Sequence, residues 1–409
     1  MGDNVRQRQK IKPYNPVRKK HQKTKSSQKT MKIGVNVRFL LQNRLEGLGR
    51  FTYETVKRIV LAHPEHEFIF FFDRPFAPEF IFAPNITPVV LYPPARHIFL
   101  FFAWFEVAIP YALRKYQCEV YFSPDGFGTL FASCPTVVVS HDLAYLHRPN
   151  DVSPLVRWYY NLMQPKHLAK ADHIFTVSEH GKQAVLDAFP TIKNEKVDVA
   201  YNSVEAGYFR KIPSVTQHSI RTEFADGKPY FFYIGSVHPR KNVLGLLKAF
   251  EIFKNKKTEN KDAMLLIGGR MAWQTSEIND FYETMQHRES VRFLGFIPTE
   301  TLPLLVGSAL ALCYVSLYEG FGIPILEAMH AEVPVLTSNT TSMPEVAADA
   351  AFLVNPHNTD DIANGLQTLW GNPDLRNMLV ERGKIRRTAF DWNVSAEKIW
   401  NVVEKLNSK

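Results

Sequence analysis

The chain has 409 residues, 45% of them hydrophobic and 22% charged, which is typical of a soluble globular protein with room for two domains. Its formal net charge of +9 resides in residues 1–30, where ten Lys or Arg accompany one Asp. The rest of the chain is neutral, which excludes a broadly basic nucleic-acid-binding body. Three interpretations of this N-terminal arm stay open: a solvated disordered tail, a contact with an anionic membrane or nucleic acid, and a segment upstream of a natural start at Met31.

The chain lacks features that would place it outside the cytoplasm. Its three cysteines form no Cys-x-x-Cys pair, which argues against a disulfide scaffold and against a zinc site. Residues 1–30 have no apolar core of a signal peptide, and the most apolar stretch, Ile98–Leu113, is interrupted by Glu106 and Pro110. We therefore expect a cytoplasmic protein without a membrane-spanning helix.

After the arm, short apolar runs alternate with amphipathic stretches. Strands are expected at Lys32–Val37, Phe68–Phe72, Val120–Phe122, Thr136–Ser140 and His173–Val177, and helices at Gly49–Ala62 and Asp151–Ala169. The polar stretch Lys211–Lys228 indicates a linker. Beyond it, buried strands are expected at Tyr230–Ile234, Ala263–Ile267, Val291–Leu294, Ala309–Tyr314 and Val335–Thr337.

This alternation predicts an α/β fold with two Rossmann-like domains, whose parallel sheets face each other across a cleft. The expected organisation is a basic disordered arm at 1–30, an N-terminal domain at 31–210, a C-terminal domain at 211–391 and a final segment at 392–409. In such sheets ligands bind at the carboxyl ends of strands, so the cleft is the expected site.

The first glycine turn is Gly47-Leu-Gly-Arg50, which stands just before an expected helix. Gly47 and Gly49 would let the backbone approach a ligand, and a helix N-terminus attracts anions. The third glycine of a dinucleotide fingerprint is absent, so an ordinary strand-to-helix turn explains this segment equally well.

The second turn, Gly235-Ser-Val-His-Pro-Arg-Lys-Asn242, directly follows an expected strand. It places Arg240 and Lys241 at the carboxyl end of that strand. Arg can bind a phosphate in a fork, whereas Lys acts as a point charge. We favour phosphate binding by this pair over an ordinary surface pair of cations.

The third turn, Glu319-Gly-Phe-Gly-Ile-Pro-Ile-Leu-Glu327, leads into a helix that Pro324 suits at its first turn. Gly320 and Gly322 make the loop flexible. A phosphate would repel Glu319 and Glu327, so these carboxylates are better suited to accepting hydrogen bonds from sugar and ribose hydroxyls. A capped helix with a solvent-facing Glu327 is the alternative.

A fourth candidate is His141-Asp142, which follows the strand Thr136–Ser140 and can reach the cleft, although a histidine bonded to neighbouring backbone is at least as common. Several motifs are absent: an Asp-x-Asp pair for a metal-bound diphosphate, a Walker motif, His-Glu-x-x-His and Gly-x-Ser-x-Gly. Phosphate charge would then be met by cations and helix dipoles rather than by magnesium.

Together these motifs resemble those of family-4 retaining glycosyltransferases of GT-B fold, and among them bacterial mannosyltransferase-like enzymes that build lipopolysaccharide or exopolysaccharide. The resemblance covers residues 31–409. It is carried by Gly47–Arg50, Val139–Asp142, Phe175–Ser178, Gly235–Asn242, Leu294–Phe296, Glu319–Met329 and Ser342–Val346.

The resemblance implies roles for the motif residues. The catalytic residues would be His141, Lys241, Arg240 and Glu319. Donor binding would involve Gly47, Gly49, Gly235, Arg240, Lys241, Phe296, Glu319, Gly320, Phe321, Gly322 and Glu327. In this scheme the two cations bind the diphosphate, Glu319 the donor sugar and Glu327 the ribose, while the end of the Leu294–Phe296 strand flanks the nucleobase. Trp392–Leu406 would be a helix that returns to the first domain, and no metal or cofactor is implied.

The implied enzyme is a metal-independent hexosyltransferase that moves a hexose, mannose first, from a nucleotide sugar to a glycan or lipid-linked glycan in cell-surface polysaccharide synthesis. GDP-mannose is the first expected donor and a UDP-sugar the second. A GT-B nucleotide-sugar epimerase and a catalytically inactive sugar-nucleotide-binding protein stay open, whereas no pyridoxal lysine can be placed for a phosphorylase.

The expected partners are the nucleotide sugar and the acceptor, without nucleic acid. The aromatic residues at 98–105, with the arm at 1–30, indicate an anionic membrane surface as a further partner, at the inner face of the plasma membrane. A packed helix is the commoner explanation of such an aromatic run.

Overall fold

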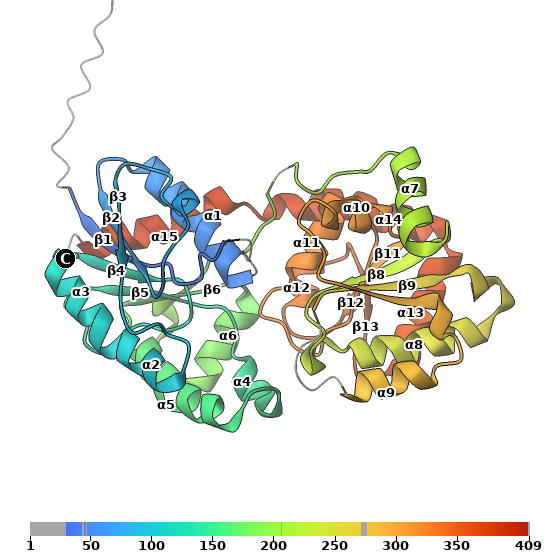
Figure 1. The fold of residues 1–409 in the computed structure, drawn as a ribbon, viewed down its shortest axis with the longest axis horizontal. Coiled ribbons are helices and arrows are strands. Elements are labelled where there is room, and N and C mark those ends of the chain that lie inside the picture. The colour runs from blue at the N-terminus through green and yellow to red at the C-terminus, as the bar shows by residue number, and fades with distance from the viewer. Residues whose placement is uncertain (1–29, 43–44, 46, 206, 271–275, 408–409) are drawn as a thin grey trace, which may run out of the picture. The chain divides into compact units, whose positions relative to one another are not determined.

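Two parallel sheets organise the chain in the computed structural model, which describes residues 30–42, 45, 47–205, 207–270 and 276–407. The first sheet has the strand order β3-β2-β1-β4-β5-β6-β7 (Figure 1). Its strands are β1 (Lys32–Asn36), β2 (Glu67–Phe72), β3 (Ile86–Val90), β4 (Val120–Ser123), β5 (Thr136–Ser140), β6 (His173–Thr176) and β7 (Val197–Val199). The order reverses between β1 and β4, so this pair is the topological switch point of the sheet.

The second sheet has the order β10-β9-β8-β11-β12-β13, and its switch point lies between β8 and β11. Its strands are β8 (Tyr230–Ile234), β9 (Met264–Gly268), β10 (Val291–Gly295), β11 (Ala311–Tyr314), β12 (Val335–Ser338) and β13 (Phe352–Val354). Neighbouring strands of both sheets pair in parallel. The predicted fold class, α/β with two Rossmann-like parallel sheets, is therefore confirmed.

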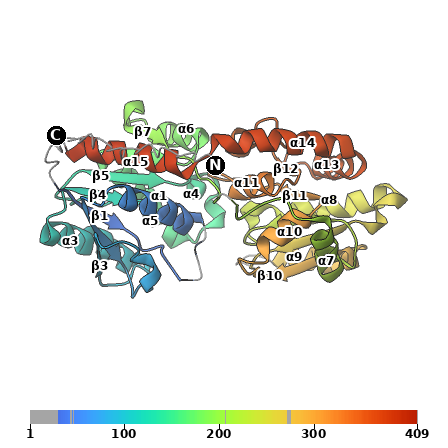
Figure 2. The same ribbon diagram turned by 90° about the horizontal axis from the view of Figure 1, so that it is seen from above.

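Helices connect the strands. The α-helices of the N-terminal half are α1 (Gly47–Ala62), α2 (Ile98–Ala103), α3 (Ile109–Tyr116), α4 (Ala144–His147), α5 (Pro154–Lys170) and α6 (Glu179–Ala188). Those that follow are α7 (Ser214–Ala225), α8 (Val243–Lys256), α9 (Ser276–Thr284), α10 (Leu302–Ser308), α11 (Ile323–His330), α12 (Met343–Ala347), α13 (Thr359–Gly371), α14 (Pro373–Arg386) and α15 (Trp392–Asn407). The last helix, α15, packs against α1 and β4 of the first sheet (Figure 2).

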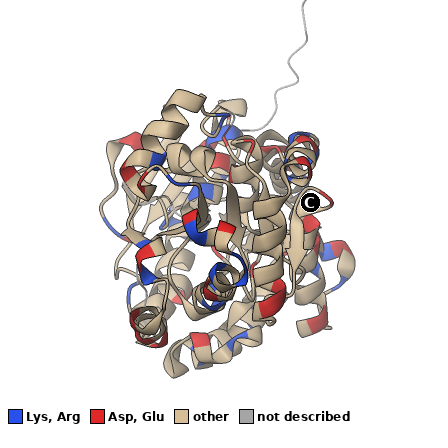
Figure 3. Cartoon of the chain, turned by 90° about the vertical axis from the view of Figure 1, so that its right-hand side faces the viewer, with Lys and Arg blue, Asp and Glu red and all other residues tan. Residues whose placement is uncertain are grey.

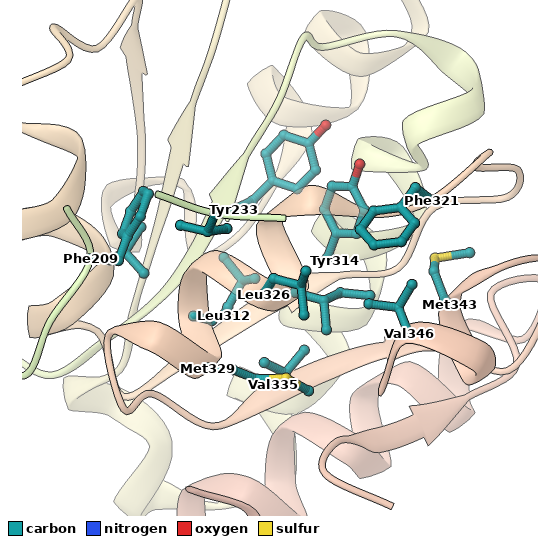
Figure 4. Packing of buried hydrophobic residues seen from close by; sticks show 14 of the residues in the cluster. Phe209, Tyr233, Leu312, Tyr314, Phe321, Leu326, Met329, Val335, Met343 and Val346 are labelled. Carbon is teal, nitrogen blue, oxygen red and sulfur yellow. The ribbon is translucent and has the colours of Figure 1, made fainter. Parts of the chain in front are cut away.

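Apolar strands and helix faces fill the core around the second sheet. Figure 4 shows how Leu312 of β11, Leu326 and Met329 of α11 and Val335 of β12 pack together. Leu312, Leu326 and Val335 are fully buried. Burial of each such side chain contributes about 2 kcal/mol of hydrophobic stabilisation. This packing anchors α11, which begins one residue after the loop Glu319–Gly322.

Several sequence expectations need correction. Three short strands were missed: β3, β7 and β13. The stretch Lys211–Lys228, expected as a linker, contains the helix α7, which packs against α10. The helix expected to begin at Asp151 begins at Pro154, because proline suits the first helical position. The run Ile98–Leu113 is interrupted at Trp104–Ala108, where the helix adopts a π turn.

Basic and acidic residues alternate over the helices and loops of the described residues in this view, as the neutral composition of residues 31–409 predicts (Figure 3). The three cysteines are not joined in disulfides. No helix in the part of the chain that the structure describes is both long and apolar enough to cross a membrane. The basic arm expected at residues 1–30 lies outside the described residues, apart from Thr30.

Candidate active site

The predicted phosphate-binding cations lie at the switch point of the second sheet. The chain turns at Gly235 after β8 and then forms a short 3-10 turn over Pro239–Lys241. The neighbouring strand, β11, ends at Tyr314 and leads into Glu319. Because β8 and β11 pair in parallel, their carboxyl ends bring Arg240, Lys241 and Glu319 to the same edge of the sheet.

Glu319 bonds directly to both cations. Its Oε2 accepts a hydrogen bond from Arg240 Nη1 at 3.1 Å, and its Oε1 accepts one from Lys241 Nζ at 2.6 Å. Tyr314 Oη also bonds to Oε1 at 2.9 Å and to Lys241 Nζ at 2.8 Å. The motifs predicted that the cations bind phosphates and that the glutamate separately binds hydroxyls. The structure joins the three groups in one cluster with a net charge of +1.

The charges of this cluster are coupled. Burial alone would raise the pKa of Glu319, but Lys241 and Arg240 outweigh it and lower the pKa to about 2. Burial lowers the pKa of Lys241 to about 8, although Glu319 opposes this. Burial also works against the charged form of Arg240, yet Glu319 raises its pKa. At neutral pH all three groups are therefore ionised in the absence of ligand.

Tyr314 connects the cluster to the core of the second domain. Its ring stacks against that of Tyr233 with centroids 6.4 Å apart, and both side chains are buried. Figure 4 shows the two phenolic oxygens pointing the same way out of the packed region. Tyr314 therefore holds Lys241 and Glu319 on a rigid support, as a catalytic constellation needs.

Gly320 lies where the third glycine turn, Glu319–Glu327, contacts His141 of the first domain. A Cβ atom at this position would lie 2.0 Å from the carbonyl oxygen of His141, so only glycine fits. The Gly320 carbonyl also accepts a hydrogen bond from Ser178 Oγ at 2.7 Å. The structure thus brings together two motifs that were predicted to share a site.

The imidazole of His141 is oriented within its own domain. His141 Nε2 lies 2.8 Å from the Pro124 carbonyl oxygen, and its ring meets Phe51 edge to face. Burial lowers the pKa of His141, so the neutral form dominates near pH 7. The carbonyl of His141, rather than Nε2, faces the Glu319 loop.

Glycines end three adjacent strands of the second sheet. Gly235, Gly269 and Gly295 all have a positive φ angle. Gly235 N donates to the Gly268 carbonyl at 3.0 Å, and Gly269 N donates to the Gly295 carbonyl at 2.7 Å. The motifs predicted Gly235 as a donor-site residue and placed Gly295 within the segment Leu294–Phe296, but Gly269 was missed, because its position beside them depends on the strand order β10-β9-β8.

The predicted glycine turn of the first domain opens α1. Gly47 is exposed with open space where a Cβ would stand, whereas a Cβ on Gly49 would lie 2.6 Å from the Phe39 carbonyl oxygen. Close packing against Phe39 is therefore enough to explain why position 49 is a glycine. Its predicted approach to a phosphate stays a prediction.

The remaining donor-site candidates divide by exposure. Phe321 is 4% exposed and packs with Phe390, so any donor contact of this residue falls to its backbone. Phe296, at the end of β10, is 60% exposed, and its ring lies 5.7 Å from the Arg270 guanidinium. An open aromatic face at a strand end can stack on a nucleobase. Gly322 precedes α11 with a φ of 107°.

Glu327 lies half-buried in α11, and Arg50 of the first glycine turn is close enough to lower its pKa. Burial has the larger effect and raises the pKa of Glu327 to about 7. Arg50 was not predicted as a site residue, and the structure adds it beside Glu327.

We expect the substitution Glu327→Gln to change how stability depends on pH. Glu327 has a raised pKa of about 7 in the folded protein against 4.5 ordinarily, so between these values the folded state binds more protons. The wild type should therefore lose stability as pH rises through this window, by less than about 1.4 kcal/mol per pH unit. Glutamine cannot titrate, so the Tm of the variant minus that of the wild type should increase from pH 5 to pH 8. If the Tm of the variant and that of the wild type change with pH in parallel, the raised pKa of Glu327 is contradicted.

One group of potential metal ligands lies within the described residues, formed by His63, Glu65 and His66. It does not fit a metal. His66 Nδ1 accepts a hydrogen bond from Met31 N at 3.2 Å, which leaves the proton on Nε2, the nitrogen that faces Glu65. His63 and His66 both stack on Trp400, at 3.8 and 5.1 Å between ring centroids. This group therefore fastens α15 to the first domain.

Two Rossmann-like sheets, with paired cations and a carboxylate at the switch point of the second, define the class of GT-B glycosyltransferases. Residues 45–207 match the family model for Glycosyltransferase Family 4, and residues 215–386 match that for Glycosyl transferases group 1. Both halves of the chain therefore match glycosyltransferase domains, as the sequence motifs implied.

Individual relatives agree with this assignment. The chain is 28% identical over 373 residues to O-antigen chain mannosyltransferase B of Escherichia coli, which spans 88% of this chain and 97% of the relative. Two solved structures share the fold. WaaG, described as a glycosyltransferase involved in lipopolysaccharide biosynthesis, has a TM-score of 0.72 at 14% identity, with 91% of this chain and 99% of that chain covered. HepE of Anabaena, in complex with UDP-glucose, has a TM-score of 0.71 at 15% identity, with 92% and 100% covered.

Proposed function

We propose that this protein is a retaining hexosyltransferase that moves mannose from GDP-mannose to a glycan or lipid-linked glycan in cell-surface polysaccharide synthesis. The observation that carries the proposal is the cluster of Arg240, Lys241 and Glu319, which lies next to the His141 carbonyl through Gly320. The mannosyltransferase relative favours mannose. The HepE complex with UDP-glucose makes a UDP-sugar the second candidate donor.

In the proposed reaction the bond between the donor sugar and the nucleoside diphosphate breaks, and the departing phosphate gains negative charge. Arg240 and Lys241 stabilise this charge as preorganised cations, without a metal. The departing phosphate oxygen takes the proton of the acceptor hydroxyl, which attacks the same face of the sugar. Retention follows from this same-face attack.

A panel of nucleotide sugars tests the donor. A bound donor stabilises the folded state by mass action, so we expect GDP-mannose to raise Tm more than UDP-glucose does. Incubation of the best donor with glycan acceptors should yield an α-linked product by NMR, at the same rate with and without EDTA. An inverted product, or loss of transfer in EDTA that Mg²⁺ restores, would overturn the mechanism.

Two alternative functions make different predictions for the same assay. An epimerase would convert the nucleotide sugar without acceptor, so a new nucleotide sugar in that incubation would favour it. A catalytically inactive binding protein would show the Tm increase without turnover. The complete ion cluster around Glu319 favours the enzyme, because a protein released from catalysis need not keep it.

We also propose that the first domain contacts an anionic membrane. Of the run 98–105, Phe101, Trp104 and Phe105 are buried, so the membrane contact predicted there is wrong for these residues. Apolar side chains are exposed on α2, on the following π turn, on α3 and on α5, which contacts α2, namely Phe99, Leu100, Phe102, Val107, Tyr111, Leu155, Trp158 and Leu162. These helices carry several Lys and Arg, and the single acid of the π turn between α2 and α3, Glu106, is buried against His167. Apolar and cationic groups together suit an anionic lipid surface.

Vesicle sedimentation tests this contact. We expect the double substitution Phe99→Ser and Trp158→Ser to reduce binding to phosphatidylglycerol vesicles at least several-fold. The matched control is Ile385→Ser on α14, a side chain that is 75% exposed on the other domain. Deletion of residues 1–30 separates the contribution of the arm. Equal binding by the double variant and the control would contradict this surface.

A further inference from the structure

The switch point of the first sheet carries a second buried ion pair. Arg38 follows β1 and Asp125 follows β4, the two strands between which the strand order reverses. Arg38 Nε donates to Asp125 Oδ2 at 2.5 Å, and the two side chains are 10% and 1% exposed. The pair occupies the same position in the first sheet that the Glu319 cluster occupies in the second.

Local bonds hold Asp125 in place. Its Oδ1 accepts a hydrogen bond from Phe127 N at 3.2 Å and lies 3.2 Å from Ser123 Oγ, whose single proton also has the Phe127 carbonyl oxygen within reach at 2.5 Å. Ser123 Oγ in turn accepts one from Asn36 Nδ2 at 3.0 Å. With Oδ2 bonded to Arg38, both carboxylate oxygens are engaged. Asp125 is therefore a positioning residue for the guanidinium rather than a free base.

Only part of the Arg38 guanidinium is used. Its carbon lies 4.1 Å from the ring centroid of Phe39, 4.9 Å from Phe101 and 5.8 Å from Phe105, so aromatic rings fix its plane. Among the described residues its two Nη nitrogens have no hydrogen-bond partner. A buried ion pair is costly in desolvation and often contributes no net stability, so an arginine fixed with unused donors at a ligand-binding edge suits a binding role.

The pair adjoins the proposed reaction centre. The residue before Asp125 is Pro124, whose carbonyl oxygen lies 2.8 Å from His141 Nε2. Burial raises the pKa of Tyr160 in α5. Arg38, Asp125 and Asp142 are also near enough to change the pKa of Tyr160, by smaller amounts. Asp142 acts in the same way on Arg240 and Lys241. A molecule bound at Arg38 would thus lie near Pro124 and His141.

We propose that Arg38, positioned by Asp125, binds hydroxyl groups of the neutral acceptor sugar through its two Nη nitrogens. The inference rests on the proposed transferase function and deepens it by naming residues of the acceptor site. A guanidinium fork with two unused donors matches a pair of adjacent hydroxyl oxygens. The charges of Arg38 and Asp125 cancel, which suits an uncharged sugar better than a phosphorylated one.

The test uses the full-length chain with GDP-mannose and a panel of methyl α-glycosides as acceptors, and it follows donor hydrolysis separately. We expect Arg38→Gln to lower kcat/KM for the best glycoside by about 10- to 100-fold, as the loss of charged hydrogen bonds predicts. The KM for donor and the rate of donor hydrolysis should change less than about twofold. The control is Arg382→Gln, an exposed arginine of α14.

The possible outcomes distinguish a failure of the acceptor assignment from a failure of the proposed transferase function. Unchanged acceptor kinetics in Arg38→Gln would overturn the assignment, and so would an equal loss of donor hydrolysis, because that would indicate a structural role. Wild-type hydrolysis without transfer to any glycoside would overturn the neutral-sugar assignment. Neither hydrolysis nor transfer by the wild type, with any donor, would instead contradict the proposed function.

A second variant tests the charge argument. Asp125→Asn leaves the Arg38 charge uncompensated, so we expect the ratio of kcat/KM for mannose 6-phosphate to that for methyl α-mannoside to increase at least several-fold. An unchanged ratio in a variant that keeps donor hydrolysis would contradict the proposed neutrality. Loss of donor hydrolysis in this variant would count against the assignment of Asp125 to acceptor positioning alone.

Discussion

Lys241→Ala should lower kcat by about 10²- to 10⁴-fold, because it removes a preorganised cation from the departing phosphate. Lys241 is nearly buried and bonds to Glu319 and Tyr314, whereas Arg240, the other cation of the cluster, bonds to the second carboxylate oxygen of Glu319. Turnover of GDP-mannose with a saturating acceptor measures the effect. Calorimetric titration with GDP should show weaker binding in parallel.

The control for this variant is Lys248→Ala, which removes an exposed lysine of α8, the helix that begins two residues after Lys241. It should keep wild-type turnover. Lys241→Met, which preserves most of the side-chain volume, distinguishes lost charge from lost packing: it should be as inactive as Lys241→Ala. Near-normal turnover of either Lys241 variant would refute the phosphate role.

Gly320→Ala should abolish most activity, on the order of a hundredfold or more, because a displaced loop misaligns the site by enough to matter. The added Cβ would lie 2.0 Å from the His141 carbonyl oxygen and 2.9 Å from Asp142 Cβ. Neither neighbour is the end of a flexible side chain. The loop must therefore move, and Glu319 moves with it.

Gly371→Ala at the end of α13 is the matched control, since nothing lies within 4 Å of the atom it adds. Thermal denaturation and kinetics of both variants should be compared. We expect Gly320→Ala to lose activity at temperatures where its fold persists. Activity like that of the control would show that the His141 contact is dispensable.

The sequence predicted the two sheets well because their central strands are uninterrupted apolar runs, such as Tyr230–Ile234. Short edge strands like Val197–Val199 offer too few residues for a pattern and were missed. The linker expected at Lys211–Lys228 was polar, but a polar stretch can still form a helix when one face packs, as α7 does against α10.

The site was partly predictable for a related reason. Arg240, Lys241 and Glu319 stand in glycine-rich segments directly after strands. Because ligands bind at the carboxyl ends of parallel strands, this position predicts a binding site. Their roles as donor-site residues stay predictions. Arg38 and Asp125 do not stand in glycine-rich segments. Their contact depends on β1 lying beside β4, and strand order cannot be read from one sequence.

If Arg240 and Lys241 bind the diphosphate as proposed, the carboxylate of Glu319 has a consequence for the end of each catalytic cycle. Two unopposed cations would retain a nucleoside diphosphate after the sugar has left, and product release would then limit the rate. Glu319 is bonded to both cations before any ligand arrives, so it competes with the diphosphate for them. In this way Glu319 would lower the affinity for the nucleoside diphosphate product while keeping both cations in position for the next donor.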